Sequence, residues 1–531
     1  MAKHRRNRVK AFGIEPIPIR HLNARPGDFS VEERLDGPTG SAGIRPGRKR
    51  PPTPPTLELS IPQQIQAIAA WSGLWELAEK MESQETPRSR TGRPRQCRAA
   101  DVLLFNIACS ILGSARATHR FFRDSVQWQL ICDTAAAAYP DDPTRRLSVS
   151  GITRNQHASY RKAHLEFDDA IEDLATAFEL LCAEIAIATG MCDPARGSWT
   201  EPAAENMVRG DGTWLPSLYN SSSPTYVDPT TGEIIPTRFD PDATAYRDNS
   251  LANGNMLVSV IARNPHPNER LILALDFKPH TNMSDATLAV DMALRIFPQL
   301  PGMQGFVYDM ALHATDYDRL LSKGLIPVSK VQRTKMGKVP VFNLNECEFT
   351  LTDGTKKYLV VQAVDGTPRI ELVIGDERQS VGLVRINTKR ISDRTDTYRF
   401  YGTWQIPNLP GIPRNLRNAT TPIRHNSSKH EIADNTPRTR ALRVIPETDD
   451  SFDRLFGLRE DSESMHHHLK MTLPNGRARS VGRHRQLFDL HGYQAHLAIT
   501  TLLAWHHRTG AELSRWFGQW KPPNHALSDA A

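Results

Sequence analysis

The chain has little cysteine and no long apolar run. Six cysteines occur in 531 residues, and none forms a Cys-x-x-Cys pair or another spacing typical of a zinc site. This pattern fits reduced thiols and argues against a disulfide framework. No apolar stretch approaches the roughly 18 residues that a membrane-spanning helix needs, and the first ten residues lead into no apolar signal segment. We therefore expect a cytoplasmic protein that is neither secreted nor bound to a membrane.

The positive charge is concentrated at the N-terminus. Residues 1–50 hold twelve Lys and Arg against five Asp and Glu, which accounts for the whole net charge of +7. The rest of the chain is close to neutral. Because this segment is rich in Gly and Pro and has no apolar period, we predict that residues 1–58 form a disordered, basic, Pro-rich arm. Such an arm suits a polyanionic partner.

Along the remaining sequence the spacing of apolar residues changes several times, as expected for a chain too long for one simple core. Residues 59–197 have apolar residues at helical spacing and predict a helical DNA-binding domain with a helix-turn-helix; helices that only pack a core are the alternative. Residues 198–330 predict three meandering strands, then helix, strand, helix and strand, which make a mixed α/β sheet. Residues 331–450 predict a β-rich insertion. Residues 451–515 predict the closing helices of the sheet domain, and residues 516–531 a flexible tail.

Two aspartates occupy matching places in this predicted sheet. Asp211 lies in the first strand and Asp309 ends the fourth, and in this strand order the two strands can lie side by side. For a single Asp in a strand, a turn or capping role is the usual explanation. Two at these places favour a metal site, because enzymes that cut or join phosphodiester bonds use carboxylates to hold two divalent metals about 3.5–4 Å apart.

A third acidic residue lies on a predicted helix over residues 456–470. At about 100° per residue, Phe456, Arg459, Glu463, His467 and Lys470 fall within one stripe, and an apolar stripe lies on another side. A solvated face with mixed charges is the alternative. The stripe instead places one carboxylate between two cations, as a metal ligand beside phosphate-binding groups would be.

The same helix contains a run of three histidines, His466, His467 and His468. Helical metal pairs need a spacing of three or four residues, and consecutive histidines diverge by about 100°. We therefore do not expect a histidine metal site. His467, beside Glu463, is better explained as a phosphate contact or as a group that supports a ligand.

The order Asp211, Asp309, Glu463 resembles that of the DDE transposases of bacterial insertion sequences, whose catalytic domain is RNase H-like. The pattern Phe456-x2-Arg459-x3-Glu463-x6-Lys470 is similar to the Tyr-x2-Arg-x3-Glu-x6-Lys signature of one large subgroup, with Phe in place of Tyr. That subgroup also has a β-rich insertion between its second Asp and its Glu. The resemblance covers about residues 90–510.

This resemblance implies a DNA transposase that binds terminal inverted repeats and catalyses metal-dependent strand cleavage and strand transfer. Asp211, Asp309 and Glu463 would be catalytic and would hold two Mg²⁺ ions, for which Mn²⁺ can substitute. Phe456 and His467 would contact DNA, together with the phosphate-binding cations of the stripe. The implied partners are the transposon ends and the target DNA, bound by a homodimer on paired ends. The implied location is cytoplasmic and nucleoid-associated, away from any membrane.

Two further DNA contacts are candidates within the insertion and beside it. In some relatives a flipped base stacks on an aromatic residue of the insertion, and Trp404 is the candidate here; a tryptophan of the insertion core is the alternative. Lys330, Arg333, Lys335 and Lys338 form a basic strip that would follow the DNA backbone. A solvated loop explains the strip nearly as well.

Other functions fit the sequence less well. A domesticated DNA-binding protein would keep the fold without cutting, yet all three acidic residues are present. An RNase H-like nuclease without strand transfer would not need the Arg and Lys of the stripe or the β insertion. A phosphatase of small molecules would explain neither the basic arm nor the helical region.

Overall fold

A computed structural model describes residues 59–523, apart from residues 84–96, 220, 222, 245–252, 267, 280–281, 334–335, 375 and 393–396. The chain divides into two compact units, Met1–Pro55 and Thr56–Ala531, and all of the described residues lie in the second. The predicted disordered arm, residues 1–58, and Lys335 of the basic strip therefore lie outside the described residues.

The first part of the described chain is helical, as predicted. The helices are α3 (Ile61–Ala70), α4 (Ser72–Ser83), α5 (Ala99–Leu112), α6 (Ala115–Arg123), α7 (Ser125–Ala138), α8 (Arg154–His164) and α9 (Asp168–Ala188). Local caps define several of their starts: Asp124 accepts hydrogen bonds from the first turn of α7, and Thr153 forms a capping box with Gln156 on α8. Helix α5 is apolar on all sides and almost wholly buried, which makes it the central helix of this region.

A five-stranded sheet follows, with the order β5-β4-β1-β6-β7. Its strands are β1 (Met207–Pro216), β4 (Gly254–Arg263), β5 (Arg270–Phe277), β6 (Gly305–Val307) and β7 (Ile326–Val328). Strands β1, β4 and β5 pair antiparallel, whereas β6 runs parallel to β1 and β7 runs parallel to β6. The predicted mixed α/β sheet is confirmed, and so is the adjacency of its first and fourth strands.

Short elements and two helices connect these strands. They are η1 (Ala204–Asn206), β2 (Thr225–Val227), β3 (Ile234–Pro236), α10 (Asp285–Ile296), η2 (Phe297–Gln299) and α11 (Ala314–Ser322). Strands β2 and β3 form a small exposed hairpin in the connection from β1 to β4. Helix α10 makes the connection between β5 and β6, and Ser284 is its N-cap, accepting a hydrogen bond from the amide of Thr287.

The insertion is β-rich, as predicted, and has a hydrophobic core of its own. Its seven strands have the order β11-β10-β9-β8-β14-β13-β12. They are β8 (Val341–Thr350), β9 (Lys356–Val364), β10 (Thr367–Ile374), β11 (Glu377–Gly382), β12 (Val384–Ser392), β13 (Tyr398–Gln405) and β14 (Thr420–Arg424), followed by α12 (Lys429–Ala433) and η3 (Arg438–Arg440). The buried residues of this core lie between Leu344 and Leu442.

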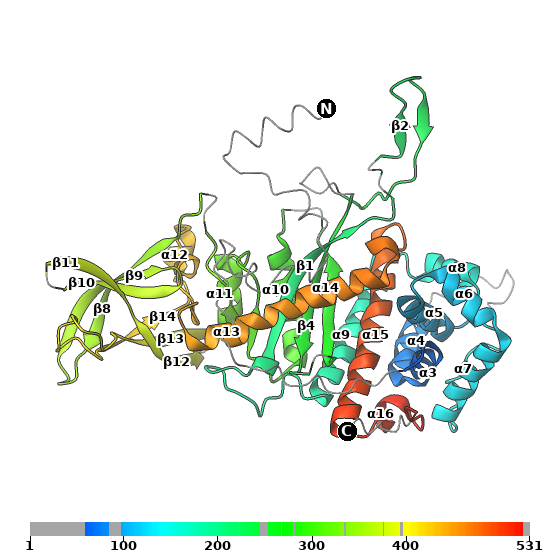
Figure 1. Cartoon of the computed structure of the whole chain (residues 1–531), viewed down its shortest axis with the longest axis horizontal. Helices are drawn as coiled ribbons and strands as arrows, with labels where there is room; N and C mark the ends of the chain where they lie inside the picture. Colours follow the sequence, from blue (N-terminus) through cyan, green and yellow to red (C-terminus); the bar gives the residue numbers. More distant parts are fainter. Residues whose placement is uncertain are drawn as a thin grey trace, which may run out of the picture. The chain divides into compact units, whose positions relative to one another are not determined.

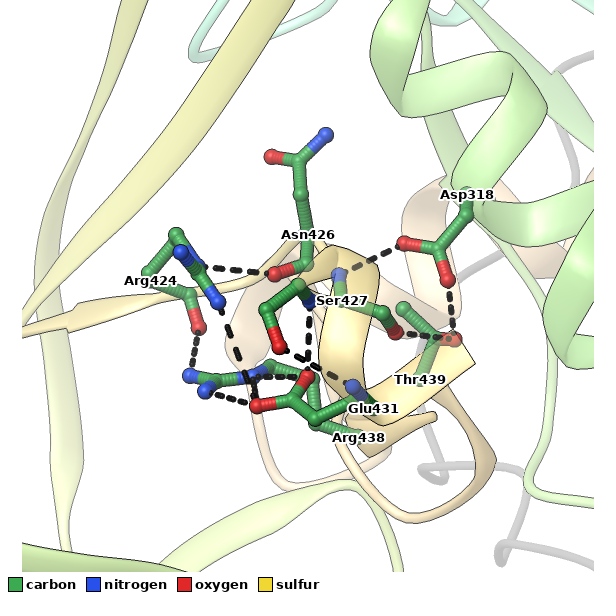
Figure 2. A network of polar contacts seen from close by, with 8 residues as sticks. Asp318, Arg424, Asn426, Ser427, Glu431, Arg438 and Thr439 are labelled. Carbon is green, nitrogen blue, oxygen red and sulfur yellow. Dashed lines mark hydrogen bonds and ion pairs between the residues drawn. The ribbon is translucent and has the colours of Figure 1, made fainter. Parts of the chain in front are cut away.

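A polar network joins the insertion to α11 (Figure 2). Asp318 of α11 accepts hydrogen bonds from the amide of Ser427 and the hydroxyl of Thr439, and burial raises the pKa of this carboxyl. Glu431 of α12 is clamped by Arg438. Burial alone would raise the pKa of Glu431, but the hydrogen bonds from Arg438 lower it overall. The contacts of Asp318 attach the segment after β14 to α11.

The chain closes with helices that cover the sheet. They are α13 (Asp450–Phe456), η4 (Gly457–Arg459), α14 (Glu460–Thr472), η5 (Pro474–Gly476), α15 (Arg483–Thr509) and α16 (Ser514–Phe517). The sequence predicted one helix through residues 456–470, but the tighter turn η4 separates α13 from α14. The predicted tail also starts too early, because Trp516 and Phe517 are buried and α16 packs against α4.

One continuous hydrophobic core runs through α3–α9, the five-stranded sheet, α10, α14 and α15. Figure 1 shows α14 across the sheet and α15 between the sheet and the N-terminal helices. In α5, the side-chain amide of Asn106 donates to the carbonyl of Phe488 in α15 at 2.6 Å. The helices approach closely there, since a Cβ on Gly492 would lie 2.8 Å from Asn106. The helical region is therefore packed as part of the same body as the sheet.

All six cysteines are free thiols, and four of them are buried, which agrees with the expectation of no disulfide framework. Among the described residues, no single helix is both long and apolar enough to cross a membrane, although α5 and α6 taken as one bent pair have the required length and composition.

Candidate active site

Adjacent parallel strands bring Asp211 and Asp309 to the same level of the sheet. Arg209 of β1 pairs with Val307 of β6, and each aspartate lies two residues beyond its member of that pair. On β1, a Cβ on Gly210 would meet Ala289 of α10, so Gly210 faces that helix. Because side chains alternate along a strand, Asp211 faces the opposite side, which α14 covers. We call Asp211 and Asp309 the carboxylate pair.

The two carboxylates act on each other electrostatically. Burial raises the pKa of Asp309, and the negative charges of Asp285 and Asp211 raise it further. The amide of Ala311 and the guanidinium of Arg459 lower this pKa, but they do not cancel the increase. The carboxylate pair thus lies in a partly buried region with excess negative charge, a condition that a bound cation relieves.

Asp285 is a third carboxylate near the pair that the sequence did not identify as a site residue. It lies in the first turn of α10, and the hydroxyl of Tyr308 donates to its Oδ2 at 3.3 Å. Burial raises the pKa of Tyr308, and Asp285, Asp309 and Asp211 add to the increase. A Cβ on Gly212 would lie 3.1 Å from the Asp285 carboxylate, so β1 has a glycine where this carboxylate approaches the strand.

His466 of α14 contacts Asp211 directly. Its Nδ1 lies 3.4 Å from Asp211 Oδ2, and its Nε2 lies 2.9 Å from the hydroxyl of Ser259. Ser259 is the residue of β4 paired with Asp211, and His466 is only 4% exposed. The imidazole therefore connects the two strands and restricts the orientation of the Asp211 carboxylate.

The sequence placed His467 on the stripe, and no role was predicted for His466. His466 follows Arg459 by seven residues, about two helical turns, and so falls near the same stripe. That spacing was the available signal. His467 is exposed, as expected of a group free to contact a phosphate. The third histidine, His468, bonds to the hydroxyl of Tyr493 at 2.8 Å.

The two cations of the predicted stripe lie beside the carboxylate pair. Lys470 is half-buried; burial lowers its pKa, while the negative charge of Asp211 opposes that decrease. Arg459 acts on Asp309 and also donates from Nη2 to Glu463 Oε1 at 2.6 Å. Its Nε is buried and has no hydrogen-bond partner in the described part of the chain. Arg459 therefore connects the predicted third ligand to the site.

Glu463 itself does not join the carboxylate pair. Its side chain is 58% exposed and held by Arg459. No group of three or more His, Cys, Asp or Glu side chains among the described residues has the arrangement of a metal site. The carboxylate oxygens of Asp211 and Asp309 are the donors that Mg²⁺ prefers, so the pair fits such an ion. A three-carboxylate site would require Glu463 to leave Arg459.

Phe456 and Lys330 contact each other instead of lying free for DNA. The ring of Phe456 is partly buried against the main core and stacks on Phe452 at 4.9 Å. The ammonium of Lys330 lies 5.6 Å from the centre of the Phe456 ring and 3.1 Å from Glu447. In this structure the Phe456 ring is a partly buried packing group, and its contact with DNA stays a prediction.

The rest of the basic strip is also partly neutralised. Arg333 lies 4.0 Å from Asp365 of the insertion, and Lys338 is likewise engaged in an interaction. With Lys330 paired to Glu447, the loop carries less free positive charge than the sequence suggested.

Trp404 lies in the core of the insertion and is 1% exposed. The alternative interpretation, a tryptophan of the insertion core, matches this position. The prediction of base stacking is corrected, because no face of this ring is open to a base.

A cavity of about 880 Å³ lies between α11 and the insertion. Leu312 and His313, which follow Asp309 closely, line one side, and Arg319, Arg333 and Arg440 line others. Asp318 also lines this cavity, and Arg319 and Arg333 form ion pairs with nearby aspartates.

A scan against protein-family models and a search of curated proteins gave no match to this chain. The assignment of a function therefore rests on the geometry of the carboxylate pair and its neighbours.

Proposed function

We propose that the chain is a DDE-type DNA transposase of an insertion sequence, with an RNase H-like catalytic domain. In this proposal it binds terminal inverted repeats and catalyses Mg²⁺-dependent strand cleavage and strand transfer, as a homodimer on paired ends. The observation that carries the proposal is the carboxylate pair, formed by adjacent parallel strands and flanked by Arg459 and Lys470. Carboxylates with phosphate-binding cations beside them are what phosphodiester chemistry requires.

The strand order supports the domain assignment. Three antiparallel strands followed by two parallel crossover strands give the order β5-β4-β1-β6-β7. This order places Asp211 beside Asp309, as the resemblance to the DDE transposases implies. The insertion also lies between Asp309 and Glu463, as it does in the subgroup with the Tyr-Arg-Glu-Lys signature.

Each side chain of the site would have a distinct role in the reaction. Mg²⁺ held by Asp211 and Asp309 would neutralise charge on the scissile phosphate and activate the attacking oxygen. Arg459 would bind a phosphate through two parallel hydrogen bonds, and Lys470 would contribute a point charge. When Arg459 turns to a phosphate it releases Glu463, which then becomes available as a third donor. DNA binding would thereby complete the ligand set.

Two successive reactions follow from this arrangement. Water attacks the phosphodiester at the transposon end, a P–O bond breaks, and a 3′-hydroxyl is released. That 3′-hydroxyl then attacks a phosphodiester of the target DNA, forming one P–O bond and breaking another. Both reactions use the same carboxylate pair.

The test is a cleavage assay with Mg²⁺ and a duplex that carries the terminal inverted repeat from the DNA flanking the gene. Asp211→Asn and Asp309→Asn should each lower the cleavage rate by about 10³-fold or more, because each removes a charged ligand of a unit that acts together. Asp453→Asn, at an exposed position of α13, is the matched control and should cleave like the wild type. Cleavage at the wild-type rate by either site variant would overturn the proposal.

The same assay separates the alternatives. Joined products with target DNA identify a transposase. A wild type that cuts the repeat and never joins it would be a nuclease without strand transfer. A wild type that binds the repeat and never cuts it would be a domesticated DNA-binding protein.

A further inference from the structure

Helices α5 and α6 have the geometry of a helix-turn-helix. They meet at 115° across the two residues Gly113 and Ser114, and Gly113 has a φ of 77° that a glycine adopts without strain. Ser114 caps α6 by accepting a hydrogen bond from the amide of Ala117 at 3.1 Å. In helix-turn-helix proteins the second helix reads the major groove of DNA, and here the second helix is α6.

The outer side of α6 carries only positive charge. Its buried residues are Thr118 and Phe122, whereas Arg116, Arg120 and Arg123 are exposed. Their spacing of four and seven residues places the three arginines within about 60° of one another and opposite the buried side. None of the three forms an ion pair or side-chain hydrogen bond with another residue in the described part of the chain. We call these three residues the arginine face.

The neighbouring helix α8 extends this basic surface. It packs against α6 and exposes Arg154 and Lys162. Neither residues 102–123 nor residues 143–165 contain an Asp or Glu. Helix α9 differs sharply, with six acidic residues and no Lys or Arg in its sequence. The positive charge is therefore localised on one side of the helical region rather than spread over it.

We propose that the arginine face of α6 is the surface on which duplex DNA docks, with α6 at the major groove and α8 against the adjacent phosphates. The proposal rests on the proposed function, because it assumes that this chain acts on DNA. Charge complementarity favours this occupant: duplex DNA presents closely spaced phosphates, and guanidinium groups without an internal partner are free to pair with them. The burial of α5 leaves α6 as the member of the pair that faces outward.

The experiment measures binding alone. The full chain is titrated against a labelled terminal-repeat duplex by fluorescence anisotropy, in EDTA, at several salt concentrations. The triple variant Arg116→Gln/Arg120→Gln/Arg123→Gln should weaken binding at least 30-fold. The slope of log affinity against log salt should fall by two to three, because each lost phosphate contact lowers it by about 0.9.

A matched control removes three exposed cations from elsewhere in the chain: Lys80→Gln/Lys323→Gln/Arg515→Gln. It should bind within twofold of the wild type. If the arginine-face triple does not fold, the three single Arg→Gln variants replace it, each with an expected loss of about 0.9 in slope. Unchanged affinity and slope in these variants would overturn the proposal, and so would an equal loss in the control.

Failure here is distinguishable from failure of the proposed function. Because EDTA prevents metal-dependent cleavage, only DNA docking is measured. A chain that cleaves through Asp211 and Asp309 and binds DNA without the arginine face would refute this inference alone. A wild type that binds no terminal-repeat duplex would refute both.

Discussion

The carboxylate pair beneath α14 and the arginine face of α6 carry opposite charge. They also differ in burial and in how far other side chains restrain them. Asp211 is 14% exposed and restrained by His466, and burial dominates the pKa of Asp309. The arginines are exposed and make no ion pair within the described residues. A site for bond cleavage needs its groups at fixed positions, whereas a docking surface needs only enough charge of one sign. We therefore expect that a small displacement of either carboxylate lowers the cleavage rate sharply. Removal of the arginines of the arginine face should instead weaken DNA binding step by step.

Among the changes that keep the charge or leave the carboxylate pair intact, the largest expected effect comes from moving the carboxylate of Asp211. Asp211→Glu keeps the carboxylate and lengthens its side chain by one methylene, next to the buried His466. Cleavage should fall by about 10²–10³-fold, because a displacement of about 1 Å has effects of that size, while the Kd for the terminal-repeat duplex should not change. The measurement is single-turnover cleavage together with anisotropy. Cleavage within threefold of the wild type would show that position matters less here than we infer.

His466 and His467 provide the next test, since they are adjacent in sequence and differ in environment. His466→Ala removes the group between Ser259 and Asp211 and should lower the cleavage rate by about 10–100-fold, the range typical of groups that orient metal ligands. His467→Ala, at an exposed position, should change the cleavage rate by less than threefold. The Kd for DNA should stay constant in His466→Ala and should rise by about threefold or less in His467→Ala, which removes a predicted phosphate contact.

His466→Asn should recover part of the activity, because its amide can still reach a hydroxyl or a carboxylate. Equal effects of the His466 and His467 alanine variants would remove the basis for the orienting role.

The helical region that carries the arginine face contains a buried neutral histidine, so acid should lower the stability of the folded chain. His157 stacks against Phe105 and Phe488, and burial lowers its pKa from an ordinary 6.5 to about 3. Below pH 6.5 the unfolded chain binds a proton here that the folded chain does not accept until about pH 3. Stability is thus retained above pH 6.5 and decreases as the pH falls, by about 1.4 kcal/mol per pH unit from this residue.

Urea unfolding at pH 6 and pH 4 measures this decrease. Because His425, His491 and His496 also have lowered pKa values, the informative quantity is the difference from His157→Gln. The variant should lose less stability over this interval than the wild type does. Identical losses would show that His157 is not the group responsible.

The smallest effect on function should come from a change on α6 that, like Asp211→Glu, keeps the charge and alters the side chain. Arg120→Lys keeps the positive charge at an exposed position and removes the planar guanidinium. The Kd for DNA should change by less than about threefold, because a phosphate contact persists, and the salt slope should stay the same. If Arg120→Lys weakened DNA binding as much as the triple glutamine variant does, the exact placement of the guanidinium would be essential, as it is for the carboxylates.

The parts of this fold that depend on local patterns were predictable from the sequence. Apolar alternation and turn residues indicated the strands, and their order was enough to place Asp211 beside Asp309. The insertion and the N-terminal helices followed from the same periodicities. These features are set by residues close together in the chain, so a sequence pattern records them directly.

The contacts that were missed or misplaced depend on tertiary packing. Asp285 reaches β1 only because α10 folds back over a glycine, and Ser259 meets His466 from more than 200 positions away. Trp404 was ambiguous because a tryptophan in an alternating strand serves equally well as a core residue or as an exposed platform. Glu463 was placed on the correct helix, and its spacing of four residues from Arg459 is that of a helical ion pair, a signal that the metal-ligand interpretation passed over.

Metal binding by the full chain tests the proposed chemistry most directly, because it needs no cleavage. Mn²⁺ is titrated by calorimetry into the wild type, Asp211→Asn, Asp309→Asn and the control Asp453→Asn. The carboxylate pair predicts that both site variants weaken Mn²⁺ binding by at least about tenfold, because each removes a charged oxygen donor, while the control binds like the wild type. Wild-type affinity in both site variants would contradict a metal site at Asp211 and Asp309.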